Sequence, residues 1–467
     1  MERETILRVW LTNGEHVLAS LTLCCMAAAP PPASPSMRVA VVGAGAAGSA
    51  AARRLAMLGA HVTLFDQAEG GPGGRASARP IGRATLAALA DHGAQFLRDD
   101  GACPALTGLL ASLAEAGHAA PWTAGRFGRV RVGAGGDGGG FSPGGSRPAS
   151  SSSFFGLTTA GAGGGAPPST LWVGTPHADG LAKGLAAHER VTPAWGARVA
   201  GLEARADGRW GLRLASEGEG GAPAPSAAAA FDGVILADAS MGRPAAPGRV
   251  TVSGAGPAAD AAADLLSRVG RATARTPLFS VCALLPCPYP AAPFDAADVE
   301  GDSAVAFLVR DSAKPGRPTV LGGGETWVAI STPATAGRLL AAAPLSGGRP
   351  PAAALTAAAE ELWAAAEEAL VAAAGPGAPR PPPPLALRAQ RWGAGLEGGA
   401  WTDEDSGGGG GASSLPRCAV DRRAPGLALC GDLFHGGEGA SLAAAVRSGL
   451  AAAEAVGGGG AWGGEGA

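Results

Sequence analysis

The sequence predicts an α/β fold built on a parallel sheet, and one βαβ unit near the N-terminus carries this prediction. Residues 38–42 (RVAVV) form a continuous apolar run, which is typical of a strand buried on both faces. Residues 46–59 are rich in Ala and end in Gly, which predicts a helix with a C-terminal glycine. Residues 61–66 (HVTLFD) predict a second strand. A strand, a crossover helix and another strand in this order are the unit from which parallel sheets are built.

Apolar patterning predicts further elements along the chain. Residues 352–374 form an amphipathic pattern, because Leu355, Leu362 and Leu370 fall on one helical face and glutamates fall on the other. The remaining predicted elements are strands over 210–214, 231–237, 278–285, 326–331 and 427–431, and a last helix over 439–456.

Glycine and proline interrupt the chain repeatedly. The 467 residues include 77 Gly and 38 Pro, which is at the edge of the low-complexity range, yet 46% of the residues are hydrophobic and can build a core. We interpret the Gly/Ser/Pro-rich stretches, the longest over 132–170, as surface insertions that are dispensable for ligand binding. Without them and residues 1–36, roughly 330 residues remain, which corresponds to about two domains.

Charge and cysteine patterns exclude several classes of protein. The formal net charge of −3 excludes a basic nucleic-acid-binding domain as the default interpretation. The seven cysteines are scattered and form no C-x-x-C pair, so we expect no metal site, no disulfide framework and an intracellular location. No apolar stretch reaches the ~20 residues of a membrane span, so we expect a soluble protein of the cytoplasm or of an organelle such as a plastid. Residues 1–36 fit either a flexible leader or a targeting segment.

A glycine motif joins the first predicted strand to the first helix. It fits the pattern G-x-G-x-x-G and consists of Gly43, Ala44, Gly45, Ala46, Ala47 and Gly48. Because glycine is so frequent in this chain, the pattern alone is weak evidence, and residues 133–138 fit it as well. That second match leads into the stretch GGGFSPGGS, which cannot form a helix, whereas the first follows a strand and opens a helix. We therefore expect a dinucleotide-binding turn at the first match only.

Each position of this motif has a physical role in such a turn. Gly43 permits the tight turn, Gly45 lets the backbone approach a pyrophosphate, and Gly48 lets the helix pack closely on the strand. The helix N-terminus offers N–H groups and a positive dipole end to the phosphates. Asp66 ends the second strand 18 residues after Gly48, where a carboxylate binds ribose hydroxyls, and we assign the adjacent Gln67 to the same site.

Two segments beyond Asp66 carry a family resemblance. Residues 73–75 read Gly-Gly-Arg and residues 91–96 read Asp-His-Gly-Ala-Gln-Phe. Here the sequence resembles the FAD-dependent amine oxidase superfamily and, within it, the renalase-like group. The resemblance implies non-covalently bound FAD. It also implies that four residues lie near the pyrophosphate and the flavin ring, namely Gly74, Arg75, Gln95 and Phe96.

The C-terminal part adds to this resemblance. Residues 430–440 are similar to a G-D-x6-E-G-A segment of the family, in which the Asp reaches the ribityl-phosphate region of FAD. This implies cofactor contacts for Asp432, Glu438, Gly439 and Ala440, with the helix N-terminus directed at the flavin, where its dipole would stabilise the anionic reduced ring. Val199 corresponds to a valine that contacts adenine in the family.

The resemblance also implies the domain organisation. A Rossmann-like FAD-binding domain of the glutathione-reductase type is expected beside an α+β substrate domain on a mixed or antiparallel sheet. The expected boundaries are a leader over 1–36, an FAD-binding domain over 37–100, 186–256 and 418–456, a substrate domain over 101–185 and 257–417, and a disordered tail over 457–467.

The substrate is specified far less clearly. Classical amine oxidases use a buried lysine near the flavin, but the chain has only Lys183, in a predicted helix, and Lys314, in a Pro/Gly-rich loop, and we expect neither to be catalytic. Weak candidates for the substrate site are Arg391 and Trp392, which match an R-W pair of renalase-like proteins, and His435, which lies near Asp432 in the sequence.

We expect an oxidoreductase that transfers hydride from a small reduced molecule to flavin, with oxygen as the acceptor. A dihydronicotinamide isomer is the favoured donor, because hydride transfer from it needs no acid–base residue. Two alternatives stay open: a flavin amine oxidase or desaturase, and a non-catalytic protein that keeps the FAD fold as a binding module.

Overall fold

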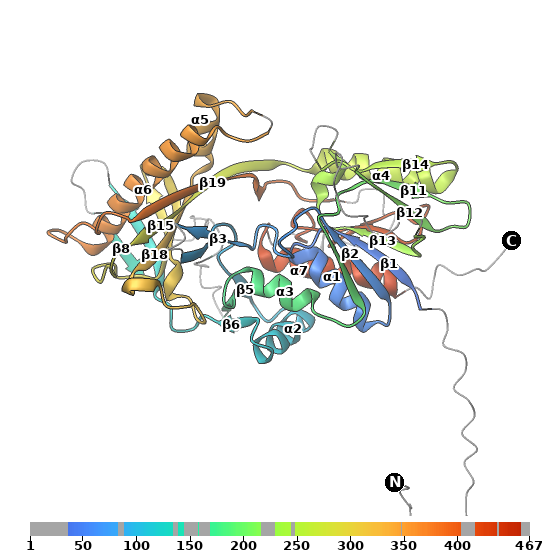
Figure 1. The fold of residues 1–467 in the computed structure, drawn as a ribbon, viewed down its shortest axis with the longest axis horizontal. Helices are drawn as coiled ribbons and strands as arrows, with labels where there is room; N and C mark the ends of the chain where they lie inside the picture. Colours follow the sequence, from blue (N-terminus) through green and yellow to red (C-terminus); the bar gives the residue numbers. More distant parts are fainter. Residues whose placement is uncertain are drawn as a thin grey trace, which may run out of the picture. The chain divides into compact units, whose positions relative to one another are not determined.

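The computed structural model describes residues 36–82, 88–133, 139–143, 157, 169–215, 229–243, 248–346, 348–402, 416–436 and 439–458. A six-stranded sheet, parallel except at one edge, contains the predicted βαβ unit (Figure 1). Its strand order is β10-β2-β1-β13-β21-β20, so that the first strand of the unit lies inside the sheet and is fully paired. The strands are β1 (Arg38–Val42), β2 (His61–Asp66), β10 (Val191–Trp195), β13 (Gly233–Leu236), β20 (Ala419–Val420) and β21 (Leu427–Leu429).

Four helices gather on one side of this sheet. Helix α1 (Ala46–Met57) packs against α7 (Leu442–Gly457), and their backbones approach so closely that a Cβ at Gly449 would lie 2.0 Å from the Ala47 carbonyl oxygen. Helices α2 (Pro104–Glu115) and α3 (Asp179–Ala186) share a buried leucine cluster with α1 and α7. The sequence assigns residues 101–185 to the substrate domain, but these two helices pack on the dinucleotide-binding side because their apolar faces complement those of α1 and α7.

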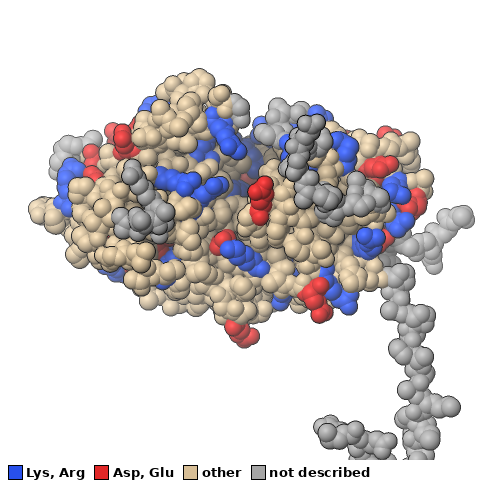
Figure 2. All heavy atoms as spheres, viewed as in Figure 1, with Lys and Arg blue, Asp and Glu red and all other residues tan. Residues whose placement is uncertain are grey.

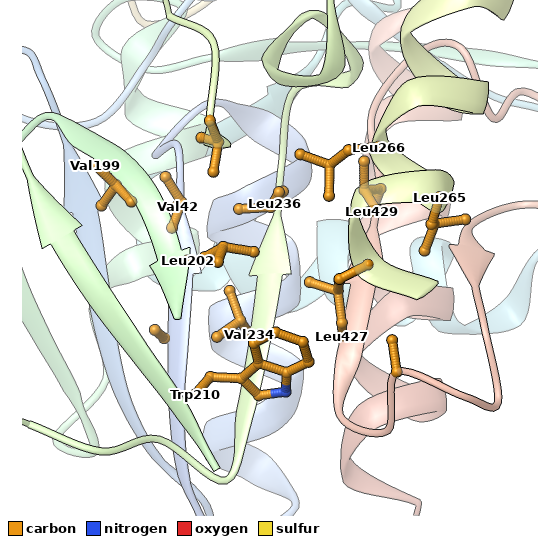
Figure 3. Packing of buried hydrophobic residues seen from close by; sticks show 14 of the residues in the cluster. Val42, Val199, Leu202, Trp210, Val234, Leu236, Leu265, Leu266, Leu427 and Leu429 are labelled. Carbon is orange, nitrogen blue, oxygen red and sulfur yellow. The ribbon is translucent and has the colours of Figure 1, made fainter. Parts of the chain in front are cut away.

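The other face of the parallel sheet carries the core drawn in Figure 3. A three-stranded sheet and one helix cover it, and the core includes Leu202 and Trp210 of that sheet and Leu265 and Leu266 of the helix. The covering elements are β11 (Val199–Ala204), β12 (Trp210–Leu214), β14 (Thr251–Gly254) and α4 (Pro257–Ala272), and the 3₁₀ turn η1 (Ala239–Gly242) lies against α4.

A second large sheet has seven strands in the order β19-β15-β18-β17-β16-β7-β8. Its pairs are antiparallel except β16 with β7. The strands are β7 (Phe127–Val132), β8 (Gly140–Pro143), β15 (Arg275–Leu285), β16 (Ala296–Gly301), β17 (Val305–Arg310), β18 (Glu325–Ser331) and β19 (Ala386–Glu397). The fold is therefore α/β, with a Rossmann-like sheet and a mixed sheet, as the sequence predicts.

The two faces of the mixed sheet have different partners. Helices α5 (Pro333–Ala342) and α6 (Ala352–Ala374) lie over one face (Figure 1). The core between this face and the helices includes Phe279, Val281 and Leu362. The opposite face packs against Ile81 and Phe96, which belong to segments that follow β2. Two small sheets connect here: the hairpin β3 (Ala78–Ile81) and β4 (Ala88–Asp91), and the sheet of β5 (Leu97–Asp99), β9 (Thr170–Gly174) and β6 (Ala119–Pro121).

Several element boundaries differ from the expected ones: β15 begins at Arg275 rather than at residue 278, and β13 is confined to Gly233–Leu236 within the expected 231–237. The last helix begins at Leu442 rather than at residue 439, because the Ser441 side chain accepts a hydrogen bond from the Ala444 N–H and caps the helix there. Most of the insertion over 132–170 lies outside the described residues, but Leu157 is buried in the core beside Phe96, and its carbonyl accepts a hydrogen bond from Arg98. This part of the insertion therefore packs on the fold rather than projecting from it.

Charged side chains are dispersed over the surface. On the face drawn in Figure 2, basic and acidic side chains are interspersed among uncharged atoms, in line with the small net charge. Within the described part of the chain, no helix combines the length and the apolar character that crossing a membrane requires.

Candidate functional site

The glycine motif forms the turn between β1 and α1. Gly43 has a φ of +101°, which is accessible to glycine but strained for other residues. A Cβ at Gly48 would lie 1.8 Å from the Gly43 carbonyl oxygen, so only glycine allows α1 to approach the strand. A Cβ at Gly45, by contrast, would meet no atom within 4 Å beyond its chain neighbours, so its backbone faces open space. Among the described residues no side chain caps the N-terminus of α1, so its first N–H groups are available to an anion.

Asp66 lies at the carboxyl end of β2, beside this turn. Its carboxylate accepts hydrogen bonds from the Ala44 N–H at 2.6 Å and from the Ala68 N–H at 2.8 Å. The carboxylate therefore holds the glycine turn as well as standing where ribose hydroxyls are expected. Val199 starts β11 close by, and the exposed Gln67 follows directly after the strand.

The Gly-Gly-Arg segment stacks directly on the glycine turn. The Gly73 N–H donates to the Ala44 carbonyl at 2.9 Å, and a Cβ at Gly74 would lie 3.2 Å from the Cα of Gly45. Gly74 itself has a φ of +57°. Segments 43–45 and 73–75 therefore form two backbone layers that touch at their glycines.

The segment around Gly93 adds a third layer. The Ala94 N–H donates to the Arg75 carbonyl at 2.8 Å, and a Cβ at Gly93 would lie 2.0 Å from that same carbonyl oxygen. Gln95 and Phe96 follow and are buried, and the ring of Phe96 packs against Phe307 of the mixed sheet. The three segments are thus stacked in sequence order, although nothing in local periodicity requires this.

Arg75 joins these layers to the C-terminal segment. Its guanidinium forms an ion pair with the buried Asp432 carboxylate at 2.5 Å, across 357 residues of sequence, and also donates to the Ala394 carbonyl at 3.3 Å. Burial alone would raise the pKa of Asp432, but the charges of Arg75 and Arg275 outweigh this effect and hold the pKa below its usual range. The carboxylate is therefore ionised at neutral pH.

The turn after Asp432 is organised by His435. Its Nδ1 accepts a hydrogen bond from the Gly439 N–H at 3.1 Å, and its Nε2 lies 3.2 Å from the Gly399 carbonyl, to which it donates in that tautomer. Both ring nitrogens therefore hold the loop together. Ala440 and Gly439 precede α7 rather than lying in its first turn, and Glu438 lies outside the described residues.

Arg391 and Trp392 lie on opposite faces of β19. Trp392 pairs with Leu278, and its side chain points toward the glycine layers. Its indole stacks on the His92 ring with 4.7 Å between the ring centres, and its Nε1 donates to the His92 carbonyl at 2.8 Å. Arg391 pairs with Phe279 on the face covered by α6, and its guanidinium donates to the Gly348 carbonyl at 3.4 Å. The two neighbours therefore do not converge on one site, because adjacent strand residues point in opposite directions.

Lys314, which we do not expect from the sequence to be catalytic, is one of the most buried charged groups of the described chain. It follows the 3₁₀ turn η2 (Asp311–Ala313), and its ammonium bonds to Asp91, Gln95 and Asp311. A signal was present in the sequence: one acidic and two basic residues, Asp311, Lys314 and Arg317, follow one another at three-residue steps directly after an apolar strand. Lys183, in contrast, is half exposed on α3 and pairs with Asp179.

The donor set fits FAD. Open space beside Gly45 and the uncapped N-terminus of α1 suit a pyrophosphate, and the carboxylate of Asp66 suits a ribose. The layers at Arg75 and Gly93, with Asp432 beside them, extend this surface toward β19. The glycine turn and Asp66 lie at the carboxyl ends of β1 and β2, and Asp432 follows the carboxyl end of β21, which is where open α/β sheets bind their ligands.

Comparison with known proteins supports the fold. Residues 41–113 match the family model described as an NAD(P)-binding Rossmann-like domain. Among solved structures, putrescine oxidase bound to putrescine has a TM-score of 0.54 and 15% identity, over 90% of this chain and 98% of that one. Cyclohexylamine oxidase from Brevibacterium oxydans has a TM-score of 0.54 and 16% identity, over 91% of this chain and 99% of that one. An oxidoreductase from Methanosarcina mazei has a TM-score of 0.55 and 13% identity, over 89% of this chain and 99% of that one. No curated protein sequence matches this chain.

These identities establish a shared fold and nothing finer. The chain has the fold of the amine oxidases over nearly its whole length, and its N-terminal segment is a Rossmann-like dinucleotide-binding unit. The renalase-like resemblance is a finer statement, and none of these comparisons supports it.

Proposed function

We propose that this chain is an FAD-dependent oxidoreductase that oxidises a small molecule and passes the electrons to oxygen. One observation carries the proposal: the segments at Gly43, Gly74 and Gly93 contact one another at their glycines, and Arg75 joins them to the buried Asp432, which is far away in the sequence. Such a surface accepts an extended dinucleotide, and the flavin ring at one end of FAD then lies beside β19. FAD bound there supplies a two-electron acceptor, and the protein supplies binding, orientation and electrostatics.

The roles of the chain's own residues follow from the geometry. The α1 N-terminus and Gly45 bind the pyrophosphate, and Asp66 binds the adenosine ribose. Arg75, fixed by Asp432, places a positive charge beside the middle of the cofactor. Trp392, held by His92, forms the side of the site that belongs to the mixed sheet.

An amine is the substrate class that the comparisons favour. The similar solved structures include a putrescine oxidase and a cyclohexylamine oxidase, and their similarity extends over the mixed sheet as well as the dinucleotide-binding part. This ranks the amine oxidase alternative above the dihydronicotinamide interpretation that the sequence favours.

A reduced nicotinamide is the second candidate, and one observation keeps it in consideration. The chain has two lysines and both are ion-paired, Lys183 on the surface and Lys314 in the interior. The base-like lysine expected for amine oxidation is therefore not free. Hydride transfer from a dihydronicotinamide needs only a flat contact such as the Trp392 ring.

One experiment tests both the function and the substrate class. The purified full chain is examined by visible spectroscopy, then mixed without oxygen with putrescine, cyclohexylamine or dihydronicotinamide isomers, and finally exposed to oxygen. We expect a yellow protein whose flavin absorbance is lost with one donor class and returns with about one hydrogen peroxide formed per donor oxidised. A colourless protein that takes up no FAD would refute the proposal. A flavin that no donor reduces would indicate the non-catalytic alternative.

A further inference from the structure

Lys314 is the centre of a buried charge cluster beside the flavin-site layers. Its side chain is fully buried, and its Nζ donates to Asp91 at 2.8 Å, to Asp311 at 2.7 Å and to Gln95 at 2.8 Å. An ammonium group has three N–H bonds, and all three are used here. Its Nζ is therefore fully engaged with three protein oxygens and is not directed at a substrate.

Arg317 balances the second carboxylate of this cluster. Its guanidinium pairs with Asp91 and lies 3.5 Å from Asp311, and it also donates to the Gly174 carbonyl at 2.9 Å. Burial would raise the pKa of Asp311, but Lys314 and Arg317 outweigh it and lower that pKa. Asp91, Asp311 and the buried His177 approach one another closely enough to hold a metal ion, but the two cations already neutralise both carboxylates, so a divalent cation gains no net attraction there.

Gln95 connects this cluster to the layer that packs on Arg75. Its amide nitrogen donates to the Asp91 carbonyl at 2.7 Å and to the Gly93 carbonyl at 2.9 Å, while its Oε1 accepts from Lys314. The Lys314 bond therefore fixes which way the amide points. A reversed amide would direct its N–H groups at the ammonium and its oxygen at two carbonyls, which is repulsive at every contact.

We propose that Lys314 is a positioning residue that, through Gln95, fixes the turn at Gly93 and Ala94 against Arg75 and so sets how that turn meets FAD. The inference rests on the proposed function, because it assigns a role within the same site. It also explains why a lysine is buried here at the cost of its hydration: a charged donor locks a neutral amide more firmly than another amide would.

Three variants separate positioning from mere charge balance. Lys314→Met leaves an unbalanced buried carboxylate and is expected to unfold readily. The double variant Asp311→Asn with Lys314→Met removes one charge of each sign, so the balance is kept while the bond to Gln95 is lost. Gln95→Met keeps all charges and removes the acceptor of the Lys314 bond, together with the two bonds that the amide donates to the Asp91 and Gly93 carbonyls. Lys183→Met is the matched control, because its exposed pair contributes little.

The readouts are the visible spectrum of bound flavin, the Kd of FAD for the apoprotein and the melting temperature of the apoprotein. We expect the double variant and Gln95→Met to shift the flavin absorption bands and to raise the Kd about tenfold, the order of one hydrogen bond. Combining Gln95→Met with the double variant should have an effect smaller than the sum of the two, since both break the bond between Lys314 and Gln95. Lys183→Met should match the wild type in all three readouts.

The outcomes distinguish this inference from the proposed function. If the wild type binds no FAD, the proposed function fails and the inference fails with it. If the wild type binds FAD but the double variant keeps its spectrum and Kd, Lys314 only balances charge and the inference is wrong. If the double variant does not fold, Gln95→Met decides: an unchanged spectrum and Kd would overturn the positioning role.

Discussion

Replacing Asp66 by Ala tests the assignment of the glycine turn as the FAD-binding element. In the structure the carboxylate holds two backbone N–H groups, those of Ala44 and Ala68, and stands where ribose hydroxyls are expected. The change removes both bonds and the charge, but it leaves β2 intact because that strand is paired along its whole length with β1 and β10.

The magnitude follows from the ribose contacts that the carboxylate would lose and from how exposed the carboxylate is to water. A hydrogen bond to a charged group is worth roughly 1.5–3 kcal/mol, which corresponds to about a 10- to 150-fold change in affinity. The bond to Ala44 is half-buried and the bond to Ala68 is exposed, so water compensates part of the loss. We therefore expect FAD affinity to fall about 10- to 30-fold, at the lower end of that range, when apoprotein is titrated with FAD and flavin fluorescence is followed.

A matched control lies at the amino ends of the strands in the same sheet, opposite the end that carries Asp66. Asp232 precedes β13 and accepts a hydrogen bond from the Arg38 N–H at 2.8 Å, so it too is a carboxylate that holds a strand end. Asp232→Ala should leave the Kd of FAD unchanged. Equal losses in both variants would mean that the effect is general destabilisation, and an unchanged Kd in Asp66→Ala would refute the ribose assignment.

The other predictions concern packing, pH and the cofactor linkage. Gly48→Ala should lower the unfolding free energy by about 1–3 kcal/mol or more, because the added Cβ would lie 1.8 Å from the Gly43 carbonyl oxygen. Gly45→Ala should fold normally and bind FAD more weakly, because its Cβ would meet no atom within 4 Å beyond its chain neighbours. Equal urea midpoints for the two variants would contradict this. Burial lowers the pKa of His92 from 6.5 to about 3, with Arg79 and Arg388 adding to the effect. The unfolded chain then binds one proton more between these values, so unfolding free energy should fall as pH falls below about 6.5, by up to about 1.4 kcal/mol per pH unit. His92→Gln should flatten that slope, and an identical slope would show that His92 is protonated in the folded state. FAD should be released into the supernatant by acid precipitation, since Cys430 is buried in the core of the parallel sheet; flavin in the pellet would indicate a covalent link.

The amino-acid sequence was sufficient to predict the first βαβ unit of the parallel sheet. Strand β1, helix α1 and strand β2 start where their apolar patterns start, and the motif glycines have the conformations and contacts that their roles require. This succeeded because the information is local: a buried parallel strand, a glycine turn and an Ala-rich helix are each specified by neighbouring residues. Helix α6 was predicted to the residue for the same reason, since a proline and a glycine bound its pattern.

Only the tertiary structure decided which distant side chains meet. The pairing of Arg75 with Asp432 and the burial of Lys314 depend on how two sheets pack, and no periodicity within either segment encodes that packing. The opposite directions of Arg391 and Trp392 depend on the register of β19 against β15, which turns one of them to α6 and the other to His92. Lys314 lies in a Pro/Gly-rich loop, so its sequence context predicts a solvent-exposed side chain. It is buried because Asp91 and Gln95, which are 219 or more residues away in the sequence, accept hydrogen bonds from it.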